Sequence, residues 1–461
     1  MIPFERTLRK NLFMPIVDRI KKTDMLSVYR ELNRTQWLSR RELEDLQLAR
    51  LRKLLIHAQE NVPYYRRLFA DIGFDAGRFT SMDELTRIPI LTKQTIRKNF
   101  ADFQAQNRSQ FAPRLGHTSG STGEPLQFYL DRSSHSYGWT NCWRAFSNEG
   151  FQLGESIAIL AGSALSPKAS PPIRTVYLFL MGHKRLMASP LNDEIIQQFA
   201  KILSRKSSPR YMYCCVSAAY QFSRYLLKRN QILPLKAIFT TSESLLPVYR
   251  ESIQSAFDCP VYDTYGNNES CLFAHECRHQ NQDNHHLHYS MESAYLEIAD
   301  DNDQILREGE IGRFIATNLA NYAMPMIRYD TGDLGALSSS ECACGSGLKL
   351  IGQILGRSRE FIVTPDGKRI HWSFFNKFPL FYDFTWISSW FICQESRRHI
   401  TVHLRPDGIP NPHDVEAIKQ KMQEKLGKDL AIDIVVSDKQ HITSAGKQKL
   451  IESHLSEEDL Q

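Results

Sequence analysis

The stretch His117–Pro125 reads H-T-S-G-S-T-G-E-P, with four hydroxyl side chains, two glycines and no bulky apolar residue. Apolar sequence follows at once in Leu126–Leu130. Glycines let the backbone come close to a ligand, and successive free N–H groups in such a turn attract anions. A Ser/Gly surface turn would have a similar composition. The order of residues instead predicts a phosphate-binding loop, and it differs from a Walker A loop because no G-K-[S/T] follows the glycines.

The order T-S-G-S-T-G-x-P resembles the phosphate-binding loop of adenylate-forming enzymes, the acyl-CoA synthetase and ligase superfamily. The resemblance implies ATP as a substrate and phosphate contacts from consecutive residues. These are Thr118, Ser119, Gly120, Ser121, Thr122 and Gly123. Glu124 stands where relatives often have a lysine, so the grip on phosphate is expected to rest on backbone and hydroxyl groups.

The composition is that of an ordinary globular protein, with 42% hydrophobic and 23% charged residues in a chain of 461. A chain this long exceeds what a single core usually serves. The net charge of +6 suits an anionic small ligand, and no basic stripe with interleaved aromatics indicates nucleic acid. Nine cysteines without a secretory context argue against a disulfide framework and predict a reducing, cytoplasmic setting.

The first 22 residues mix basic and apolar side chains, without the long apolar run of a signal peptide or a spanning helix. The favoured interpretation is a helix packed on its own domain. The alternative is a basic amphipathic helix that touches a membrane or a partner. A homodimer is left open.

Strands alternating with helices predict α/β layers with ligand loops at the carboxyl ends of the strands. Helices are expected at 24–72, 133–148, 195–203, within 211–227, at 248–257 and at 412–426. Strands are expected at 157–160, 237–240, from 261, at 294–298, 312–317, 361–363, 386–392, 400–404 and 432–436, with a polar loop at 166–172. From Gly356 the pattern changes to a small α+β domain. We therefore expect a large adenylation domain over 1–356, carrying the ATP, acid and zinc sites, and a mobile lid domain over 357–461.

Two motifs in the large domain match the superfamily in order. In Y-G-N-N-E (Tyr265–Glu269), the resemblance implies that Tyr265 and Gly266 lie against adenine and that Glu269 helps to hold Mg²⁺, a cation that prefers oxygen ligands. In Y-D-T-G-D (Tyr329–Asp333), it implies that Asp333 binds the ribose hydroxyls. Either stretch alone would also suit a turn. Ser242 and Glu243, which follow the strand at 237–240, are added to the predicted nucleotide site.

Two further motifs lie in the small domain. In G-R-S-R-E (Gly356–Glu360), Arg357 matches an arginine that reaches the nucleotide, and Glu360 takes the hinge position where Asp or Lys is commoner. In T-S-A-G-K (Thr443–Lys447), Lys447 matches the lysine that enters the site during adenylation. The resemblance implies that domain rotation brings these side chains to the nucleotide.

Cysteine and histidine spacing predicts a structural zinc site. Cys277, His288, Cys342 and Cys344 make a closed three-cysteine, one-histidine set, and the arrangement is similar to a zinc site of phenylacetate-CoA-ligase-like enzymes. Unlinked thiols are the alternative, and His285 or His286 could replace His288 as the ligand.

The N-V-P-Y-Y-R and S-M-D-E-L-T-R-I-P segments, at 61–66 and 81–89, resemble the phenylacetate-CoA-ligase-like branch and its capsule-biosynthesis (CapK-type) relatives. The implied activity is ATP-dependent activation of a carboxylic acid through an acyl-adenylate, followed by transfer to CoA. An amine or a carrier-protein thiol is the alternative acceptor. A non-catalytic nucleotide- or zinc-binding scaffold is the alternative of another class, supported by Asn267–Asn268, Glu360 and the insert at 271–288. The acid is not identified, and its pocket is expected near 137–146 and 213–217.

Overall fold

The computed structural model describes most of the chain. The described residues are 3–118, 125–161, 171–187, 191–205, 207–279, 285–357, 360–372, 374–375, 380–381, 384, 386–439, 441 and 449–455. Two compact units are present, one of Met1–Leu245 and Arg250–Ile354 (unit 1), the other of Leu246–Tyr249 and Leu355–Gln461 (unit 2). Each unit is described by itself.

Unit 1 begins with helices. They are α1 (Pro3–Leu8), the π-helical turn η1 (Arg9–Phe13), α2 (Met14–Ile20), α3 (Met25–Thr35), α4 (Arg40–Asn61) and α5 (Pro63–Asp71). The prediction that residues 24–72 are helical is confirmed, and the region is divided into the three helices α3, α4 and α5. The predicted capping box is present, because Ser39 and Glu42 exchange side-chain-to-backbone hydrogen bonds at the start of α4. Pro63 lacks an N–H and therefore begins a new helix instead of extending α4.

Short elements connect these helices to the sheet. They are η2 (Ala76–Arg78), η3 (Met82–Arg87), α6 (Lys93–Lys98) and η4 (Arg108–Phe111). A two-stranded antiparallel hairpin follows, formed by β1 (Arg114–His117) and β2 (Gln127–Leu130).

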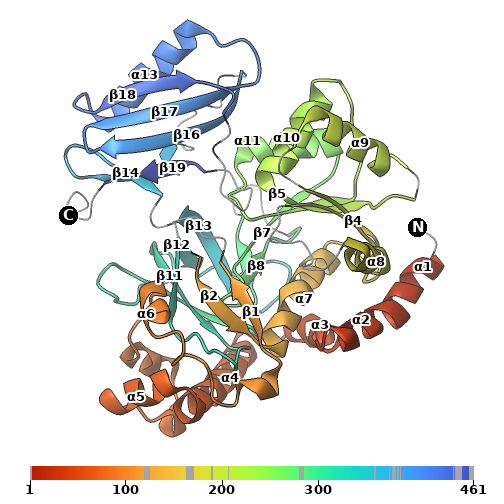
Figure 1. Ribbon diagram of the computed structural model, residues 1–461, viewed down its shortest axis with the longest axis vertical. Helices are drawn as coiled ribbons and strands as arrows, with labels where there is room; N and C mark the ends of the chain where they lie inside the picture. Colours follow the sequence, from red (N-terminus) through yellow and green to blue (C-terminus); the bar gives the residue numbers. More distant parts are fainter. Residues whose placement is uncertain are drawn as a thin grey trace. The chain divides into compact units, whose positions relative to one another are not determined.

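One half of the central sheet of unit 1 is parallel (Figure 1). Its strands are β3 (Ile157–Ala161), β4 (His183–Met187), β5 (Tyr211–Cys215), β6 (Ala237–Thr241) and β7 (Val261–Gly266). The helices between and before them are α7 (Arg132–Asn148), α8 (Pro171–Met181), α9 (Asp193–Leu203), α10 (Val216–Leu227) and α11 (Pro247–Phe257). Every residue of β3, β5 and β6 is buried, as expected for parallel strands covered on both faces.

The other half of the sheet continues from β7 with antiparallel pairs. Its strands are β8 (Phe273–His275), β9 (Leu287–Tyr289), β10 (Ala294–Ala299), β11 (Gly312–Asn318), β12 (Tyr329–Ser338) and β13 (Leu350–Arg357). The whole sheet runs in the order β10-β11-β12-β13-β9-β8-β7-β6-β5-β3-β4. The order places β9 beside both β8 and β13, so segments far apart in the sequence meet there.

The aromatic side chains of the helix predicted at 133–148 pack in the core of unit 1. In α7, Tyr137, Trp143 and Phe146 are buried, and the Phe146 ring lies 4.2 Å from that of Phe239 on β6. Tyr213 on β5 is buried in the same core. The aromatic residues expected to line an acid pocket therefore contribute mainly to packing.

A buried ion pair links α7 to the antiparallel half of the sheet. Arg144 Nη1 donates to Glu292 Oε1 at 2.8 Å, and both side chains have no exposed surface. Thr35 of α3 donates to the same oxygen at 2.6 Å. A buried charge of this kind is tolerated only while its partner is present, so the pair fixes the mutual position of α3 and α7.

Unit 2 is the α+β domain that the sequence predicted. Its strands are β14 (Phe361–Val363), β15 (Arg369–His371), β16 (Ile387–Ser396), β17 (His399–Pro406), β18 (Ala431–Val436) and β19 (Ile451–Ser453), and its helix is α13 (Pro412–Leu426). Four strands form a sheet in the order β18-β17-β16-β19. Trp390, Ile392, Val402 and Leu404 from this sheet share a buried core with Ile418 of α13. Among the described helices of both units, none combines the length and the apolar content needed to cross a membrane.

Candidate active site

The predicted phosphate loop connects the two strands of the β1–β2 hairpin. Residues 119–124, with Ser119, Gly120, Ser121, Thr122 and Gly123, lie outside the described residues. Thr118 is described, and it closes the base of the loop. Its N–H donates to Leu126 O at 3.0 Å, and its hydroxyl accepts from Leu126 N at 2.9 Å. Thr118 therefore uses its side chain to hold the ends of the loop together.

Two predicted nucleotide residues, 68 positions apart in sequence, meet in space. Tyr265 near the end of β7 donates its hydroxyl hydrogen to Asp333 Oδ2 on β12 at 2.6 Å. Asp333 is buried, and Thr331 Oγ1 accepts from its N–H at 3.1 Å. Its strand begins at Tyr329, so the stretch considered as a possible turn is part of a strand, with Gly332 at a positive φ of 78°. The aromatic ring and the carboxylate thus form one fixed pair.

Gly266 follows Tyr265, and its backbone lies close to the backbone of Leu272. A Cβ at this position would lie 2.9 Å from Leu272 O, so a side chain does not fit without movement. The Asn267 N–H donates to that same Leu272 oxygen at 3.0 Å, and Asn267 Oδ1 accepts from Ser270 N at 3.2 Å. Asn267 therefore shapes the turn that carries Glu269.

Glu269 lies on this turn. The residue as a whole is only 6% exposed, and its backbone oxygen accepts from Asn318 Nδ2 at 3.0 Å. Among the described residues no side chain or backbone group donates to its carboxylate, and none forms an ion pair with it. An ionised carboxylate in such a place needs a cation or a hydrogen-bond donor. Its oxygens are of the ligand type that Mg²⁺ prefers.

The pair Ser242 and Glu243 lies where the parallel strand β6 ends. Ser242 has a positive φ of 76°, so the chain turns sharply there. Glu243 accepts from the Ser217 N–H at 2.7 Å and from the Ser217 hydroxyl at 3.0 Å. This carboxylate therefore caps the first turn of α10. Its described contacts are structural, and they place it at the carboxyl edge of the parallel strands.

The small-domain residues belong to unit 2. Arg357 ends β13, and its carbonyl oxygen lies 3.1 Å from His371 Nε2. Glu360 O accepts from Trp372 N at 3.1 Å. Lys447 lies outside the described residues.

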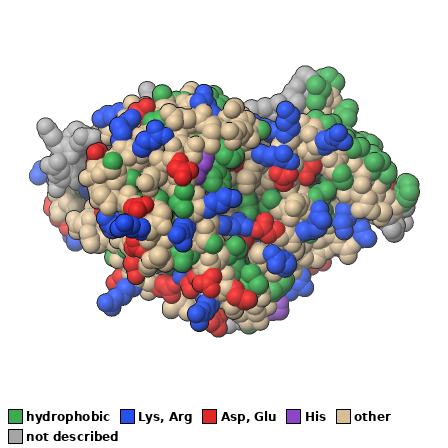
Figure 2. Space-filling view, turned by 90° about the horizontal axis from the view of Figure 1, so that it is seen from below, with side chains coloured by type: hydrophobic (Ala, Val, Ile, Leu, Met, Phe, Trp, Pro, Cys, Tyr) green, Lys and Arg blue, Asp and Glu red, His purple; other side chains and the backbone are tan. Residues whose placement is uncertain are grey.

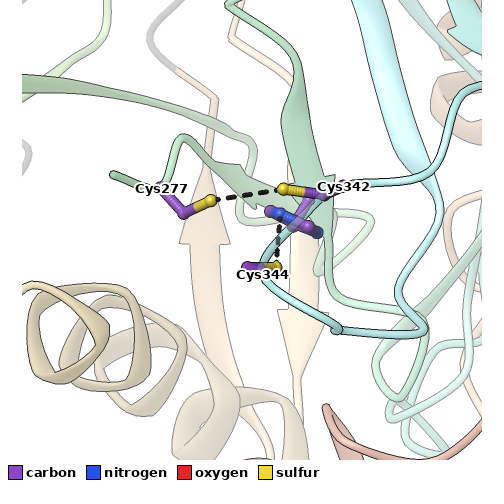
Figure 3. Close-up of side chains that lie close together, drawn as sticks. Cys277, Cys342 and Cys344 are labelled. Carbon is purple, nitrogen blue, oxygen red and sulfur yellow. Dashed lines mark hydrogen bonds between the residues drawn. The ribbon is translucent and has the colours of Figure 1, made fainter. Parts of the chain in front are cut away.

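The four predicted zinc ligands converge from three segments of unit 1. Ligand atoms of Cys277, His288, Cys342 and Cys344 all lie within 4.8 Å of one another. Cys277 Sγ is 3.6 Å from Cys342 Sγ, and Cys344 Sγ is 3.5 Å from His288 Nε2 (Figure 3). Tetrahedral zinc with Zn–S bonds of about 2.3 Å would need sulfurs about 3.7 Å apart. The predicted ligand set is therefore assembled with suitable spacing, through His288 and not His285 or His286.

The electrostatics of this cluster favour thiolate at Cys344 and oppose it at Cys277, whose hydrogen bond to Cys344 and burial raise the pKa of its own thiol. A hydrogen bond from Cys277 lowers the pKa of the Cys344 thiol, and the backbone N–H of Ser346 also donates to its sulfur at 3.4 Å. Burial opposes a charge on His288, but hydrogen bonds with Cys342 and Cys344 raise the pKa of that ring to about 8. Soft sulfur and imidazole donors in a closed group fit structural zinc.

Several buried ion pairs of unit 1 have no counterpart among the predicted site residues. They include Arg144–Glu292 and Arg328–Glu297. Another joins Arg250 Nη2 to Glu276 Oε1 at 2.7 Å, next to Cys277, while Glu276 Oε2 accepts from Asp263 N at 2.8 Å. Sequence offers little signal for them, because a single arginine or glutamate does not reveal a distant partner.

The comparisons with known proteins fit this geometry. A scan against protein-family models matches none of them. The chain is 26% identical over 337 residues to a phenylacetate-coenzyme A ligase of Thermus thermophilus, a match that covers 71% of this chain and 73% of that one. It is 24% identical over 362 residues to the protein CapK of Staphylococcus aureus, covering 77% and 76%.

The fold resembles the crystal structure of a 2-hydroxyisobutyryl-CoA ligase in its postadenylation state. The TM-score is 0.71 at 18% identity, and the match covers 93% of this chain and 92% of that one. The chain is therefore similar in sequence to phenylacetate-coenzyme A ligases and to CapK, and it has the fold of an adenylate-forming CoA ligase. The resemblance on which the site residues were predicted is therefore confirmed for the fold and for the branch that contains phenylacetate-CoA ligases and CapK.

Proposed function

We propose that this chain is an AMP-forming ligase that activates a carboxylic acid with ATP and passes the acyl group to CoA. The observation that carries the proposal is the contact between Tyr265 and Asp333, with the buried Glu269 on the turn after Tyr265. These residues come from two separate motifs in the order that adenylate-forming enzymes share. CoA is the proposed acceptor because phenylacetate-coenzyme A ligases are among the relatives.

In the first step, a carboxylate oxygen of the acid attacks the α-phosphorus of ATP. The bond between that phosphorus and the bridging oxygen of pyrophosphate breaks, and an acyl-adenylate forms. The reaction needs no protein nucleophile, so catalysis depends on positioning and on the neutralisation of charge. In the second step, the CoA thiolate attacks the acyl carbon, a thioester forms, and AMP leaves with the oxygen that the acid supplied.

The residues of unit 1 would divide the work of holding the nucleotide. Asp333 would accept hydrogen bonds from the ribose hydroxyls while Tyr265 fixes its orientation, since their contact is 2.6 Å. The loop of residues 118–123 would bind phosphate, with Thr118 closing its base. Bound Mg²⁺ would neutralise phosphate charge, and Glu269 is the side chain proposed to hold it.

Asn267 supports this assignment. Its Nδ2 group is buried and has no acceptor among the described residues, although Oδ1 is engaged by Ser270. An unpaired buried donor beside Glu269 is costly for the empty protein. An anionic oxygen of a bound nucleotide would satisfy it.

Unit 2 would supply Arg357 and Lys447, and a rotation of this lid domain, with its boundary at residue 356 or 357, would bring them to the nucleotide. The test is exchange of labelled pyrophosphate into ATP in the presence of a panel of carboxylic acids that includes phenylacetate and 2-hydroxyisobutyrate. Exchange should require an acid and should fall by about a thousandfold in Lys447→Ala, since a charge that contacts the transferring phosphate contributes several kcal/mol. Absence of exchange with every acid, with nucleotide still bound, would favour the scaffold function.

The acceptor has its own test. Once exchange identifies an acid, the products are analysed with CoA and with amino acids or amino sugars as acceptors. Thioester formed only with CoA supports the ligase proposed here. Amide formed at similar rates without CoA would instead support an amine acceptor.

We also propose that Cys277, His288, Cys342 and Cys344 bind one structural Zn²⁺. Their spacing, the N–H that donates to Cys344 Sγ and the closed set of four donors support this. The ion would tie the loop between β12 and β13 to β8 and β9. Elemental analysis of the purified protein should give one zinc per chain, and substoichiometric zinc that does not rise on reconstitution would count against the proposal.

A further inference from the structure

The N-terminal helices and α8 are neighbours in unit 1 (Figure 1). Lys21, directly after α2, places its ammonium nitrogen 3.7 Å from the ring centre of Tyr177 on α8. Arg9 of η1 lies over Gly182, at the end of α8, where an added Cβ would approach Arg9 Nη1 to 2.9 Å. Arg9 also donates to Ser156 Oγ at 2.9 Å. Segments more than 150 residues apart are thus held together.

The inner sides of these helices account for their attachment to the domain. Met14 and Val17 of α2 and Met181 of α8 are buried in one cluster, together with Trp143 of α7. This cluster contains the apolar face with which an amphipathic helix packs on its own domain. Further apolar side chains on the same helices are therefore not required for packing.

The outer sides are nevertheless apolar. Phe4 is 71% exposed, Ile20 75%, Ile173 63% and Phe179 69%. With Leu12, Ile16 and Val176, these residues define what we call the N-terminal apolar surface. Single exposed apolar residues are normal, but a gathering of them on neighbouring helices indicates an interaction site.

The positive charge of the protein is concentrated at the same place. Residues 3–22 contain six basic and two acidic side chains, and residues 171–187 contain three basic side chains and none that is acidic. These segments alone carry a formal charge of +7, whereas the whole chain carries +6, so the remainder is close to neutral. Figure 2 shows basic and hydrophobic side chains side by side on the right-hand end of this face of the molecule.

We propose that the N-terminal apolar surface docks unit 1 on a lipid bilayer with anionic headgroups. Helices with exposed Phe and Ile beside Lys and Arg lie in the plane of a membrane interface, where apolar burial and attraction to anionic lipid add together. A second copy of this chain would bring the same positive charge to the contact and is disfavoured. The proposal is independent of the catalytic function above, because it rests on residues outside the nucleotide site.

The test is flotation of the full-length protein with vesicles of phosphatidylcholine mixed with phosphatidylglycerol, and with vesicles of phosphatidylcholine alone. The protein should bind the anionic vesicles, and binding should weaken as salt is added. The double variant Ile20→Glu/Phe179→Glu should reduce the partition coefficient by at least about tenfold, since each side chain loses its apolar burial. Lys10→Glu/Lys22→Glu should reduce it by about tenfold or more on the same vesicles, because each reversal removes one attraction and adds a repulsion.

Matched controls keep the result interpretable. Ile232→Glu in unit 1 and Ile409→Glu in unit 2 change residues that are 63% and 92% exposed but lie outside the surface, and these variants should bind as the wild type does. Circular dichroism should show all variants folded, because the altered side chains are solvent-exposed. Wild-type protein that stays unbound on anionic vesicles would overturn the proposal. So would unchanged binding by Ile20→Glu/Phe179→Glu, or a solution dimer that this variant dissociates while no vesicle binding occurs.

Discussion

The Cys/His cluster and the nucleotide site differ in how their predicted residues are used by the fold. The four donors Cys277, His288, Cys342 and Cys344 face one another within 4.8 Å. In the nucleotide site, Tyr265 contacts Asp333, whereas the carboxylate of Glu269 has no partner among the described residues. In a site that stabilises the fold, the polar side chains are arranged to face one another. In a site that serves a reaction, some polar side chains keep no protein partner and can contact the substrate or its metal ion.

The largest effect is expected from breaking the cluster. Cys342→Ser should lose the bound zinc and lower the free energy of unfolding by about 3 kcal/mol or more, because the ion stabilises only the folded chain. Metal content and chemical denaturation measure the two consequences. Cys259→Ser, at a free cysteine outside the cluster, should change neither. Equal stability of the Cys342 and Cys259 variants would show that the cluster does not hold a structural ion.

The next effect belongs to the nucleotide site. Glu269→Gln should reduce the rate of pyrophosphate exchange by about a hundredfold while leaving the free energy of unfolding nearly unchanged, because the carboxylate has no partner to lose among the described residues. Exchange rates over a range of Mg²⁺ concentrations should show a weaker apparent affinity for the ion. Glu251→Gln, an exposed change on α11, is the control. A large loss of stability in Glu269→Gln with normal exchange would reverse the distinction between the two sites.

A smaller effect is expected at the contact between Tyr265 and Asp333. Tyr265→Phe removes the hydroxyl that donates to Asp333 and should raise the KM for ATP by about tenfold, the usual cost of a hydrogen bond to a charged group. A cycle with Asp333→Asn should give less than additive losses, since both changes remove the same bond. Strict additivity would mean that the two side chains act separately. Tyr220→Phe on α10 serves as the matched removal of a hydroxyl.

The smallest effect is the dependence of stability on pH that the buried His183 causes. Burial and the nearby charge of Lys21 lower the pKa of His183 to about 3, whereas the pKa of His288 is raised. An unfolded histidine titrates near 6.5, so His183 binds protons more readily in the unfolded chain. Its contribution to stability is therefore present above about pH 6.5 and lost as the pH falls below it, by at most about 1.4 kcal/mol per pH unit.

The free energy of unfolding, measured at several values between about pH 7 and about pH 5, tests this prediction. His183→Asn should flatten the dependence on pH relative to the wild type, and His413→Asn at an exposed position should not. A wild-type slope that persists in His183→Asn would assign it to other groups.

Local signals in the sequence predicted local structure well. The capping box at Ser39 and the helix stop before Pro63 involve neighbouring residues, so they could be identified without the fold. Several elements have no counterpart among the predicted ones, including the strands β1, β2, β4 and β5. The apolar, proline-led sequence of α8 predicts no element beyond residue 172, and the T-G-D turn signal concealed that Asp333 lies within strand β12.

Contacts at long range needed more than local pattern. The resemblance implied only that Tyr265 and Asp333 bind the same nucleotide, and their direct hydrogen bond was not predicted. No motif marked Arg144 and Glu292, which are 148 residues apart, since pairing of buried charges depends on the tertiary fold. The exposed apolar side chains on α8 also became visible only when burial was known.

The central claim is that the carboxylate of an acid attacks the α-phosphorus of ATP. It is tested most directly by supplying an acid with heavy oxygen in its carboxylate and analysing the products by mass spectrometry after a complete turnover with CoA. The account predicts one labelled oxygen in AMP and unlabelled pyrophosphate. Label in inorganic phosphate, with ADP as the nucleotide product, would contradict it, because the acid would then have attacked the γ-phosphorus.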